Sequence, residues 1–412
     1  MATKPINKDL LVGIDIGTSK VVTLVGEVSH DGKLNVVGVG SHPSQGLKRG
    51  VVVNIESTVQ SIKASVERAQ EMANCEIYSA FTGIAGSHIA SMNSHGMVPI
   101  RDMEVSAQDV DRVLDAAKAV PIPADQKILH VLPQEFIIDQ QVTKEPIGMS
   151  GMRLEAKVHI VTGAVSAAQN IVKCMQRCNL TTSDIVLEPF ASSQSILTED
   201  EKELGVCMID IGGGTTDIAI FTGGSIRHTA IIPIAGDQVT NDISVAFRTP
   251  VKQAEQIKME YGCALADLVD VSQAIDVSLV SDKGGRKVSL SALTEVIEAR
   301  YEELFTLVAH ELIRSGLQDS LAAGIVLTGG ASKVMGAQAL AERIFNLPVR
   351  IGKPYNVTGL SDIIDNPIYA TGVGLLVYAM KQSQRSGSSA PVTSSNMKSL
   401  WSRMRSWFQG NF

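Results

Sequence analysis

The chain has 412 residues, of which 44% are hydrophobic, 19% are charged and 4% are aromatic. This composition is typical of a globular protein and excludes a disordered or fibrous chain, and the length suggests two to four domains. The 36 basic and 43 acidic side chains leave a net charge of −7. This balance argues against a nucleic-acid partner, because a nucleic-acid-binding surface needs an excess of basic residues.

The charge distribution and the cysteines bear on location. Residues 381–412 contain five Lys or Arg and no Asp or Glu, so this tail carries +5 and the remainder of the chain −12. The five scattered cysteines are odd in number, which argues against a disulfide framework and for a reducing compartment. We find neither an apolar signal core at the N-terminus nor a run of 18 apolar residues, so we expect a cytoplasmic protein without a transmembrane span.

The first elements are predicted to be a strand, a tight turn and a strand. Residues 10–16 are apolar and largely β-branched, Gly17-Thr18-Ser19 follow, and residues 21–28 are again apolar. A third strand is expected over 34–39. Apolar residues at helical spacing then predict a helix over 51–72.

This opening pattern recurs later in the chain. Residues 206–211 are apolar, 212–216 read Gly-Gly-Gly-Thr-Thr, and 218–221 are apolar again. Residues 13–17 (GIDIG) align with 208–212 (MIDIG), 195 positions later. This weak internal repeat predicts two similar lobes, each beginning with a strand, a turn and a strand.

The segment between the two repeats has a different sequence pattern. Residues 86–161 contain a predicted helix over 106–119, with Ser106 as its N-cap, and strand-like runs at 128–132 and 136–138. We therefore expect an inserted α+β subdomain in this segment.

After the second repeat, two helical regions are expected to frame a second small subdomain. They cover 238–266 and 293–315, and a buried strand over 324–327 is then followed by Gly329-Gly330. Residues 382–395 are rich in Ser, Gly and Pro, which predicts a flexible linker.

The common nucleotide-binding motifs do not fit this sequence. Residues 13–20 have the wrong spacing and order for a P-loop. Gly38-Val39-Gly40 lacks the third glycine of a dinucleotide-binding fingerprint, and residues 212–217 lead into a strand rather than a helix.

The two Asp-Ile-Gly turns nevertheless suit a nucleotide. Glycine at a turn lets backbone N–H groups approach an anion, since no Cβ intervenes. Asp15 and Asp210, near the ends of the first strands, can hold Mg²⁺ through water. A third glycine segment, Gly329-Gly330-Ala331, could let an adenosine lie flat against the backbone. Hydroxyl donors for phosphate oxygens flank the first two turns: Thr18, Ser19, Thr215 and Thr216.

The three glycine segments, in this order, resemble those of the actin-like ATPase superfamily, which contains actin, sugar kinases and heat-shock chaperone ATPases. Within it the chain resembles the FtsA family of bacterial cell-division proteins over nearly its whole length. The insert is what separates this family from its relatives. The stretches that carry the resemblance are 11–20, 133–140, 147–162, 205–217, 232–242, 255–264 and 323–332.

The resemblance implies an α/β fold, namely a two-lobed actin-like ATPase with an inserted α+β subdomain and a C-terminal amphipathic helix. It also implies a division of the chain. The parts are a first lobe core (1–85, 162–194 and 366–380), the inserted subdomain (86–161), a second lobe core (195–240 and 301–365), its small subdomain (241–300), a linker (381–395) and the helix (396–412).

The resemblance further implies ATP and Mg²⁺ as cofactors, with hydrolysis weak or absent and no base assigned. Glu188-Pro189 resembles a turn that lies near the metal in the chaperone relatives. The first phosphate loop would be Gly17, Thr18, Ser19 and Lys20, and the second Asp210, Gly212, Gly213, Gly214, Thr215, Thr216 and Asp217. Gly236 and Asp237 would lie near the ribose, Glu255 and Lys258 beside the adenosine, and Gly329, Gly330 and Ser332 over the base.

The C-terminal residues have the pattern of an amphipathic helix. Its apolar face would carry Met397, Leu400, Trp401, Met404, Trp407 and Phe408, with Lys398, Arg403 and Arg405 off that face. Such a helix is roughly 24 Å long, too short to span a bilayer but suited to lying in the interface of an anionic membrane. Docking on the body or on a partner is the alternative, and the preceding linker argues against it.

Two functions are open at this point. The first, favoured by the tail and the insert, is an ATP-binding protein that self-associates into filaments and tethers FtsZ to the inner face of the cytoplasmic membrane at the division site. The second is a small-molecule kinase of the same superfamily. In FtsA relatives the second-lobe small subdomain receives the C-terminal peptide of FtsZ, and Arg286 and Arg300 are candidates for that contact. Later division proteins are expected to bind the inserted subdomain.

Overall fold

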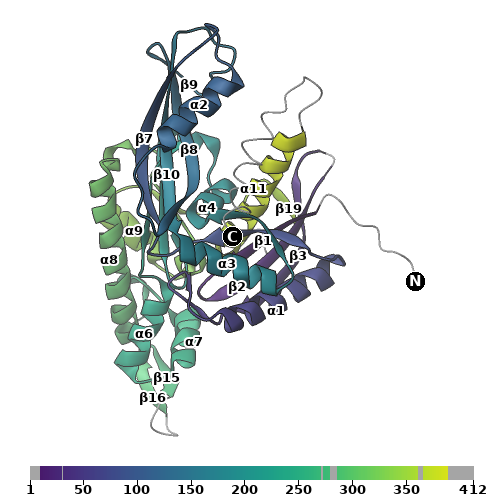
Figure 1. The fold of residues 1–412 in the computed structure, drawn as a ribbon. Helices are drawn as coiled ribbons and strands as arrows, with labels where there is room; N and C mark the ends of the chain where they lie inside the picture. Colours follow the sequence, from purple (N-terminus) through teal and green to yellow (C-terminus); the bar gives the residue numbers. More distant parts are fainter. Residues whose placement is uncertain (1–9, 30, 271, 279–284, 361–364, 388–412) are drawn as a thin grey trace, which may run out of the picture. The chain divides into compact units, whose positions relative to one another are not determined.

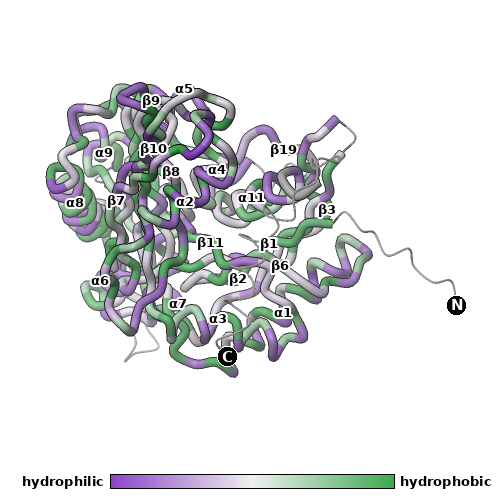
Figure 2. Tube along the Cα trace, turned by 45° about the horizontal axis from the view of Figure 1, so that its top comes forward, coloured by the Kyte–Doolittle hydropathy of each residue, from purple (hydrophilic) through white to green (hydrophobic). Residues whose placement is uncertain are grey.

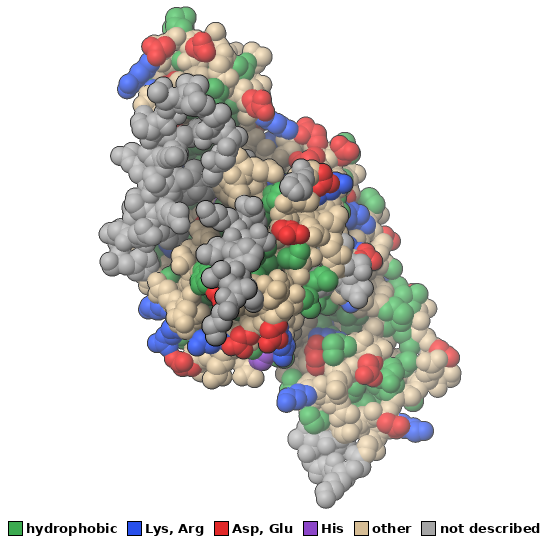
Figure 3. Space-filling view, turned by 90° about the vertical axis from the view of Figure 1, so that its right-hand side faces the viewer, with side chains coloured by type: hydrophobic (Ala, Val, Ile, Leu, Met, Phe, Trp, Pro, Cys, Tyr) green, Lys and Arg blue, Asp and Glu red, His purple; other side chains and the backbone are tan. Residues whose placement is uncertain are grey.

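The computed structural model describes residues 10–29, 31–270, 272–278, 285–360 and 365–387 (Figure 1). One compact unit takes in the residues up to Ala90 together with Gly163–Met380, and a second includes Ser91–Thr162. On the face shown in Figure 3, acidic and basic side chains of the described residues are interspersed rather than separated by sign.

The first unit contains two mixed sheets, the first with six strands in the order β11-β6-β1-β2-β3-β19. β1 and β2 form the predicted antiparallel hairpin, and β6 lies parallel to β1. The strands are β1 (Leu10–Ile16), β2 (Lys20–Val28), β3 (Leu34–Pro43), β6 (Ser79–Ile84), β11 (Thr181–Leu187) and β19 (Val357–Gly359).

Different helices cover the two faces of this sheet, because successive side chains of β2 point in opposite directions. Val22 and Leu24 belong to a core that includes residues of α11 (Ala370–Gly387). The Thr23 hydroxyl oxygen lies 2.9 Å from that of Ser65 on α1, on the opposite face.

Helix α1 (Ile55–Ala73) carries hydrophobic and hydrophilic residues along its length, as expected of a helix with one packed face (Figure 2). It begins later than the predicted helix over 51–72. Asn54 caps it by accepting a hydrogen bond from the Ser57 N–H, and Val51–Val52 form the short strand β5 instead.

The second sheet has five strands in the order β14-β13-β12-β17-β18. Its strands pair as those of the first sheet do: β12 and β13 form an antiparallel hairpin like β1 and β2, and β17 lies parallel to β12 as β6 does to β1. The predicted internal repeat is therefore confirmed in the topology. The strands are β12 (Val206–Ile211), β13 (Thr216–Thr222), β14 (Ser225–Ile232), β17 (Ile325–Thr328) and β18 (Val349–Ile351).

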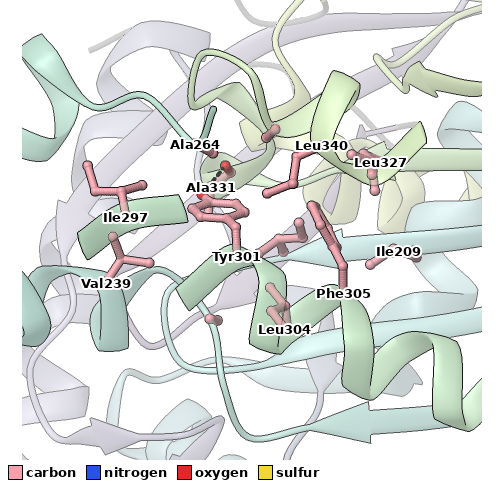
Figure 4. Packing of buried hydrophobic residues seen from close by; sticks show 14 of the residues in the cluster. Ile209, Val239, Ala264, Ile297, Tyr301, Leu304, Phe305, Leu327, Ala331 and Leu340 are labelled. Carbon is pink, nitrogen blue, oxygen red and sulfur yellow. Dashed lines mark hydrogen bonds between the residues drawn. The ribbon is translucent and has the colours of Figure 1, made fainter. Parts of the chain in front are cut away.

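A large apolar core covers one face of the second sheet (Figure 4). Tyr301 and Phe305 of one long helix pack there with Leu327 of β17, and the buried Tyr301 hydroxyl donates to the Ala331 carbonyl at 2.7 Å. The helices that supply this core are α6 (Gly236–Phe247), α7 (Val251–Tyr261), α8 (Leu290–Ser315) and α9 (Ala337–Phe345).

The second unit is a four-stranded sheet in the order β7-β10-β8-β9, with helix α2 packed on it. The predicted N-cap is confirmed, because Ser106 and Asp109 form a reciprocal capping box. One strand replaces the two predicted runs, since β8 continues through Pro133. The elements are β7 (Ala90–Pro99), α2 (Ala107–Lys118), β8 (Gln126–Ile138), β9 (Gln141–Thr143) and β10 (Arg153–Ala164).

Pro133 lies in the part of β8 that β9 does not pair with, since that pairing runs only from Phe136 to Ile138. Proline is tolerated where its missing N–H is not needed by a neighbouring strand.

The predicted linker over 381–395 begins later than expected, because α11 continues to Gly387. Residues 381–386 contain neither Gly nor Pro, so nothing in them stops the helix. None of the described helices combines the length and apolarity needed to cross a bilayer.

The described chain also contains short elements that connect these layers. The helices are α3 (Val165–Arg177), α4 (Glu188–Ile196) and α5 (Glu199–Leu204), and the strands are β4 (Leu47–Lys48), β15 (Ala274–Ser278) and β16 (Gly285–Ser289). The 3-10 turns are η1 (Ala266–Leu268), η2 (Gln318–Ser320), η3 (Gly330–Lys333) and η4 (Pro367–Tyr369).

Candidate functional site

The two repeated turns have the same backbone closure. The Gly17 N–H donates to the Lys20 carbonyl at 3.1 Å, and the Gly212 N–H donates to the Thr215 carbonyl at 3.0 Å. The amides at the two turn tips take no part in this closure, so they are suited to meeting an anion.

These turns lie against each other within the first unit. A Cβ on Gly214 would lie 2.5 Å from the Thr18 hydroxyl oxygen, and a Cβ on Gly213 would lie 2.8 Å from the Cβ of Ser19. The Thr18 oxygen also accepts the Gly50 N–H at 3.0 Å. The structure therefore brings together two predicted phosphate loops that are far apart in the sequence.

The hydroxyl of Thr216 is not available for phosphate, contrary to the prediction. It donates to the Ile234 carbonyl at 2.7 Å, and the residue is fully buried. Thr216 is the first residue of β13, and strand alternation turns its side chain into the protein.

Four carboxyl groups gather behind the turns: those of Asp15, Asp210 and Asp217, which are buried, and that of Glu188, which is half-buried. Burial raises the pKa of Asp15 to about 7, with Lys20 lowering it and Asp210 raising it. Burial also raises the pKa of Glu188 and of Asp217 well above the usual range, and the neighbouring carboxylates raise both further. A cation beside these groups would lower their pKa values and favour the ionised carboxylates.

The cationic side chain among these carboxylates is Lys20. Burial lowers its pKa to about 8, while Asp15 raises it and Lys333 lowers it. The Lys20 ammonium lies 5.2 Å from the ring centroid of Tyr369. Lys333 and Tyr369 were not predicted from the sequence, because only the fold brings η3 and η4 to the first turn.

A magnesium ion fits the chemistry of this cluster, because the donors are carboxylate oxygens and Asp217 Oδ1 is buried without a hydrogen-bond partner. In the part of the chain that the structure describes, no three His, Cys, Asp or Glu side chains are grouped as direct ligands of one metal ion. The binding of the ion by Asp15 and Asp210 through water stays a prediction.

The residues predicted for the ribose and adenosine form a connected group beside the second turn. The Asp237 N–H donates to the Gly213 carbonyl at 2.8 Å, at the start of α6. Lys258 donates to the Gly236 carbonyl at 3.0 Å and pairs with Glu255 at 2.7 Å. These contacts hold α7 against the start of α6.

The third glycine segment is the last part of the predicted nucleotide site. The Ser332 hydroxyl donates to the Gly329 carbonyl at 2.7 Å and is buried, so it stabilises the turn itself. A Cβ on Gly330 would make only an ordinary contact, 3.6 Å from Ile368. Gly330 therefore presents open backbone.

Comparison with known proteins decides the family. The chain is 62% identical over 410 residues to the cell division protein FtsA of Pseudomonas aeruginosa, covering 98% of each chain. It is 46% identical over 420 residues to that of Escherichia coli K12, covering 99% of this chain and 100% of the relative.

The chain belongs to the FtsA family of cell division proteins. The family model for FtsA matches residues 207–374, and that for the SHS2 domain inserted in FtsA matches residues 86–162.

Solved structures place this FtsA-family chain in the actin-like fold. The PilM–PilN type IV pilus biogenesis complex matches with a TM-score of 0.66 at 18% identity, over 91% of this chain and 99% of that chain. MreB5 of Spiroplasma citri bound to ADP matches with a TM-score of 0.55 at 16% identity, over 92% and 99%. The predicted two-lobed actin-like fold is thus confirmed.

The two arginines proposed for partner contact differ in their surroundings. Arg300 donates to both carboxylate oxygens of Asp242, at 2.6 and 3.0 Å, and pairs with Glu303. Arg286 lies over the ring of Phe247, with 5.7 Å between its guanidinium carbon and the ring centroid. The predicted membrane residues lie outside the described residues.

Proposed function

We propose that this FtsA-family protein binds ATP with Mg²⁺ between its two phosphate turns, assembles into filaments and tethers FtsZ to the membrane through its C-terminal helix. The observation that carries the nucleotide proposal is the contact of Gly213 and Gly214 with Ser19 and Thr18. This contact supports the proposal, because it brings the amides of both turns close enough to bind one phosphate chain.

Three further features support nucleotide binding. MreB5 of Spiroplasma citri, which shares the fold, was solved with ADP. Lys20 supplies a positive charge next to the turns, and a bound cation would favour the ionised forms of the carboxylates behind them. ATP with Mg²⁺ supplies both an anion for the amides and a cation for the carboxylates.

The tethering part of the proposal depends on the tail. Residues 396–412 combine a Trp-rich apolar face with basic residues, the pattern of a helix that lies in a membrane interface. One such helix binds reversibly, and many helices on one filament would bind by avidity. Self-association would in this way control attachment.

Electron microscopy on an anionic lipid monolayer tests filament formation and anchoring together. The full chain is applied with ATP and Mg²⁺, beside a variant truncated after Ser395. We expect filaments on the lipid for the full chain and none attached for the truncated variant. A clean monolayer for both would contradict the proposal and direct attention to the kinase alternative, tested by ADP release in a metabolite panel.

A peptide titration tests the FtsZ contact. The labelled C-terminal peptide of FtsZ is titrated with the wild type and with the double variant Arg286→Ala/Arg300→Ala. We expect the double variant to bind about tenfold more weakly, since charged contacts at an interface contribute on this scale. Arg101→Ala, an exposed arginine of the inserted unit, is the control and should bind as the wild type does.

A further inference from the structure

Three segments far apart in the sequence meet at one carboxylate of the site. Ser192 lies on α4, Asp210 on β12 and Thr371 at the start of α11. The Ser192 hydroxyl donates to Asp210 Oδ2 at 2.7 Å, and the Ser192 and Thr371 hydroxyl oxygens are 3.0 Å apart. All three side chains are buried.

The protons of this cluster can be assigned by elimination. A hydroxyl carries one proton, and that of Ser192 goes to the carboxylate. The Thr371 proton therefore goes either to the Ser192 oxygen or to Asp210 Oδ2, which lies 3.4 Å away. Ser192 thus donates to the carboxylate directly, and Thr371 supports the same oxygen either directly or through the Ser192 hydroxyl.

The second oxygen of Asp210 faces a different element. A Cβ on Gly329 would overlap Asp210 Oδ1, so only glycine allows this approach, and Gly329 has a φ of +83°. The carboxylate is held from one side by two hydroxyls and bordered on the other by the third glycine segment. Rotation about its Cβ–Cγ bond would break the hydroxyl bonds to Oδ2.

We propose that Ser192 and Thr371 are positioning residues for the nucleotide-bound cation. They would hold Oδ2 of Asp210, so that Oδ1 keeps a constant orientation toward the water shell of Mg²⁺. This inference rests on the proposed nucleotide function and names residues outside the glycine turns.

The energetics agree with this role. Burial raises the pKa of Asp210, and the hydrogen bonds from Ser192 and Thr371 lower it in part. Partners that orient a ligand carboxylate contribute strongly, since their loss costs about 10- to 100-fold in metal affinity. If a hydroxyl served packing alone, its removal would change ATP affinity equally with and without the metal.

The chain offers a matched control on the same helix. Ser195 is also buried on α4, and its hydroxyl donates to the Ala370 carbonyl at 2.7 Å, next to Thr371. Ser195→Ala therefore removes a buried hydroxyl bond between α4 and α11 without touching Asp210. Thr371→Ser keeps the donor, whereas Thr371→Val keeps the shape and removes it.

The test is calorimetric titration of the full chain with ATP, in Mg²⁺ and in EDTA, with the unfolding midpoint of each variant measured alongside. We expect Ser192→Ala and Thr371→Val to lose about tenfold in ATP affinity in Mg²⁺ and less than about twofold in EDTA. Ser195→Ala should keep the wild-type ratio of the ATP affinities in Mg²⁺ and in EDTA. Thr371→Ser should also have the wild-type ratio, in contrast to Thr371→Val.

Other outcomes would overturn the inference in recognisable ways. An equal loss with and without Mg²⁺, or the same loss in Ser195→Ala, would assign the two hydroxyls to packing alone. An unchanged ratio in Ser192→Ala would remove the positioning role while nucleotide binding stands. Failure of the wild type itself to bind ATP would overturn the proposed function, and the inference with it.

Discussion

Gly214 lies so close to Thr18 that a Cβ on the glycine would be 2.5 Å from the threonine hydroxyl oxygen and 2.9 Å from its Cβ. The two residues belong to the two copies of the internal repeat. Their contact joins the first sheet to the second at the tips of matching hairpins. Any larger residue at 214 would therefore separate the turns.

Replacing this glycine should damage both the site and the fold. In Gly214→Ala the turns must move apart, and we expect an overpacking cost of about 1–3 kcal/mol in the free energy of unfolding. ATP affinity should fall at least about tenfold, because amides displaced from a charged phosphate lose strong hydrogen bonds. Gly285→Ala is the control, since its Cβ would make only an ordinary contact, 3.5 Å from the Val277 carbonyl. Calorimetry and chemical denaturation measure both quantities, and unchanged ATP affinity in Gly214→Ala would contradict the role of the turns.

The open backbone at Gly330 permits a cleaner test of where the base lies. A methyl group there meets nothing closer than 3.6 Å, so Gly330→Ala should change the unfolding free energy by less than about 0.5 kcal/mol. If the adenine lies flat on this segment, the methyl group should weaken ATP binding about tenfold, which corresponds to 1.4 kcal/mol. Full affinity in a stable Gly330→Ala protein would place the base elsewhere.

The buried carboxylates predict how stability depends on pH. Burial raises the pKa of Asp15 from 3.8 to about 7, so between these values the folded state binds more protons than the unfolded state. The free energy of unfolding of the nucleotide-free protein should therefore fall as the pH rises from about 4 to about 7.

Asp15→Asn should reduce that slope, because the amide has no proton to lose. The variant should match the wild type near pH 4 and exceed its unfolding midpoint near pH 7. Asp125→Asn, an exposed aspartate of the inserted unit, should leave the slope unchanged. Differential scanning fluorimetry between about pH 4 and about pH 7 measures this slope. A midpoint that rises with pH in the wild type would contradict the raised pKa of Asp15.

The pairing of Arg300 with Asp242 predicts a modest contribution to stability. Both side chains are about a quarter exposed, with 25% relative accessibility each. A double-mutant cycle of Arg300→Ala and Asp242→Ala should give a coupling of about 0.5–1 kcal/mol, the range of partly exposed ion pairs with good geometry. The same cycle repeated in high salt should give a smaller value. A coupling near zero would contradict a contribution of this ion pair to the stability of the fold.

Much of the organisation of this protein follows from sequence patterns. The repeated Asp-Ile-Gly turns predicted two similar lobes, and the two sheets share the same order over five strands, with β19 as an additional edge strand of the first. Local signals such as the Ser106 N-cap also held. The predicted boundaries of helices and strands were less accurate, because they depend on capping residues and on neighbouring elements. Asn54, for example, caps α1, so that this helix begins at Ile55.

The local sequence by itself determined which turns could meet a phosphate, because glycine and hydroxyl residues impose their conformational and chemical properties wherever they stand. Only the tertiary structure decided which side chains share the site. The Thr216 side chain points into the protein because of strand alternation, and its hydroxyl bonds the Ile234 carbonyl. Ser192 and Thr371, which carry no motif, reached Asp210 because α4 and α11 pack there. Burial and distance between remote segments are properties of the folded chain, and no local pattern records them.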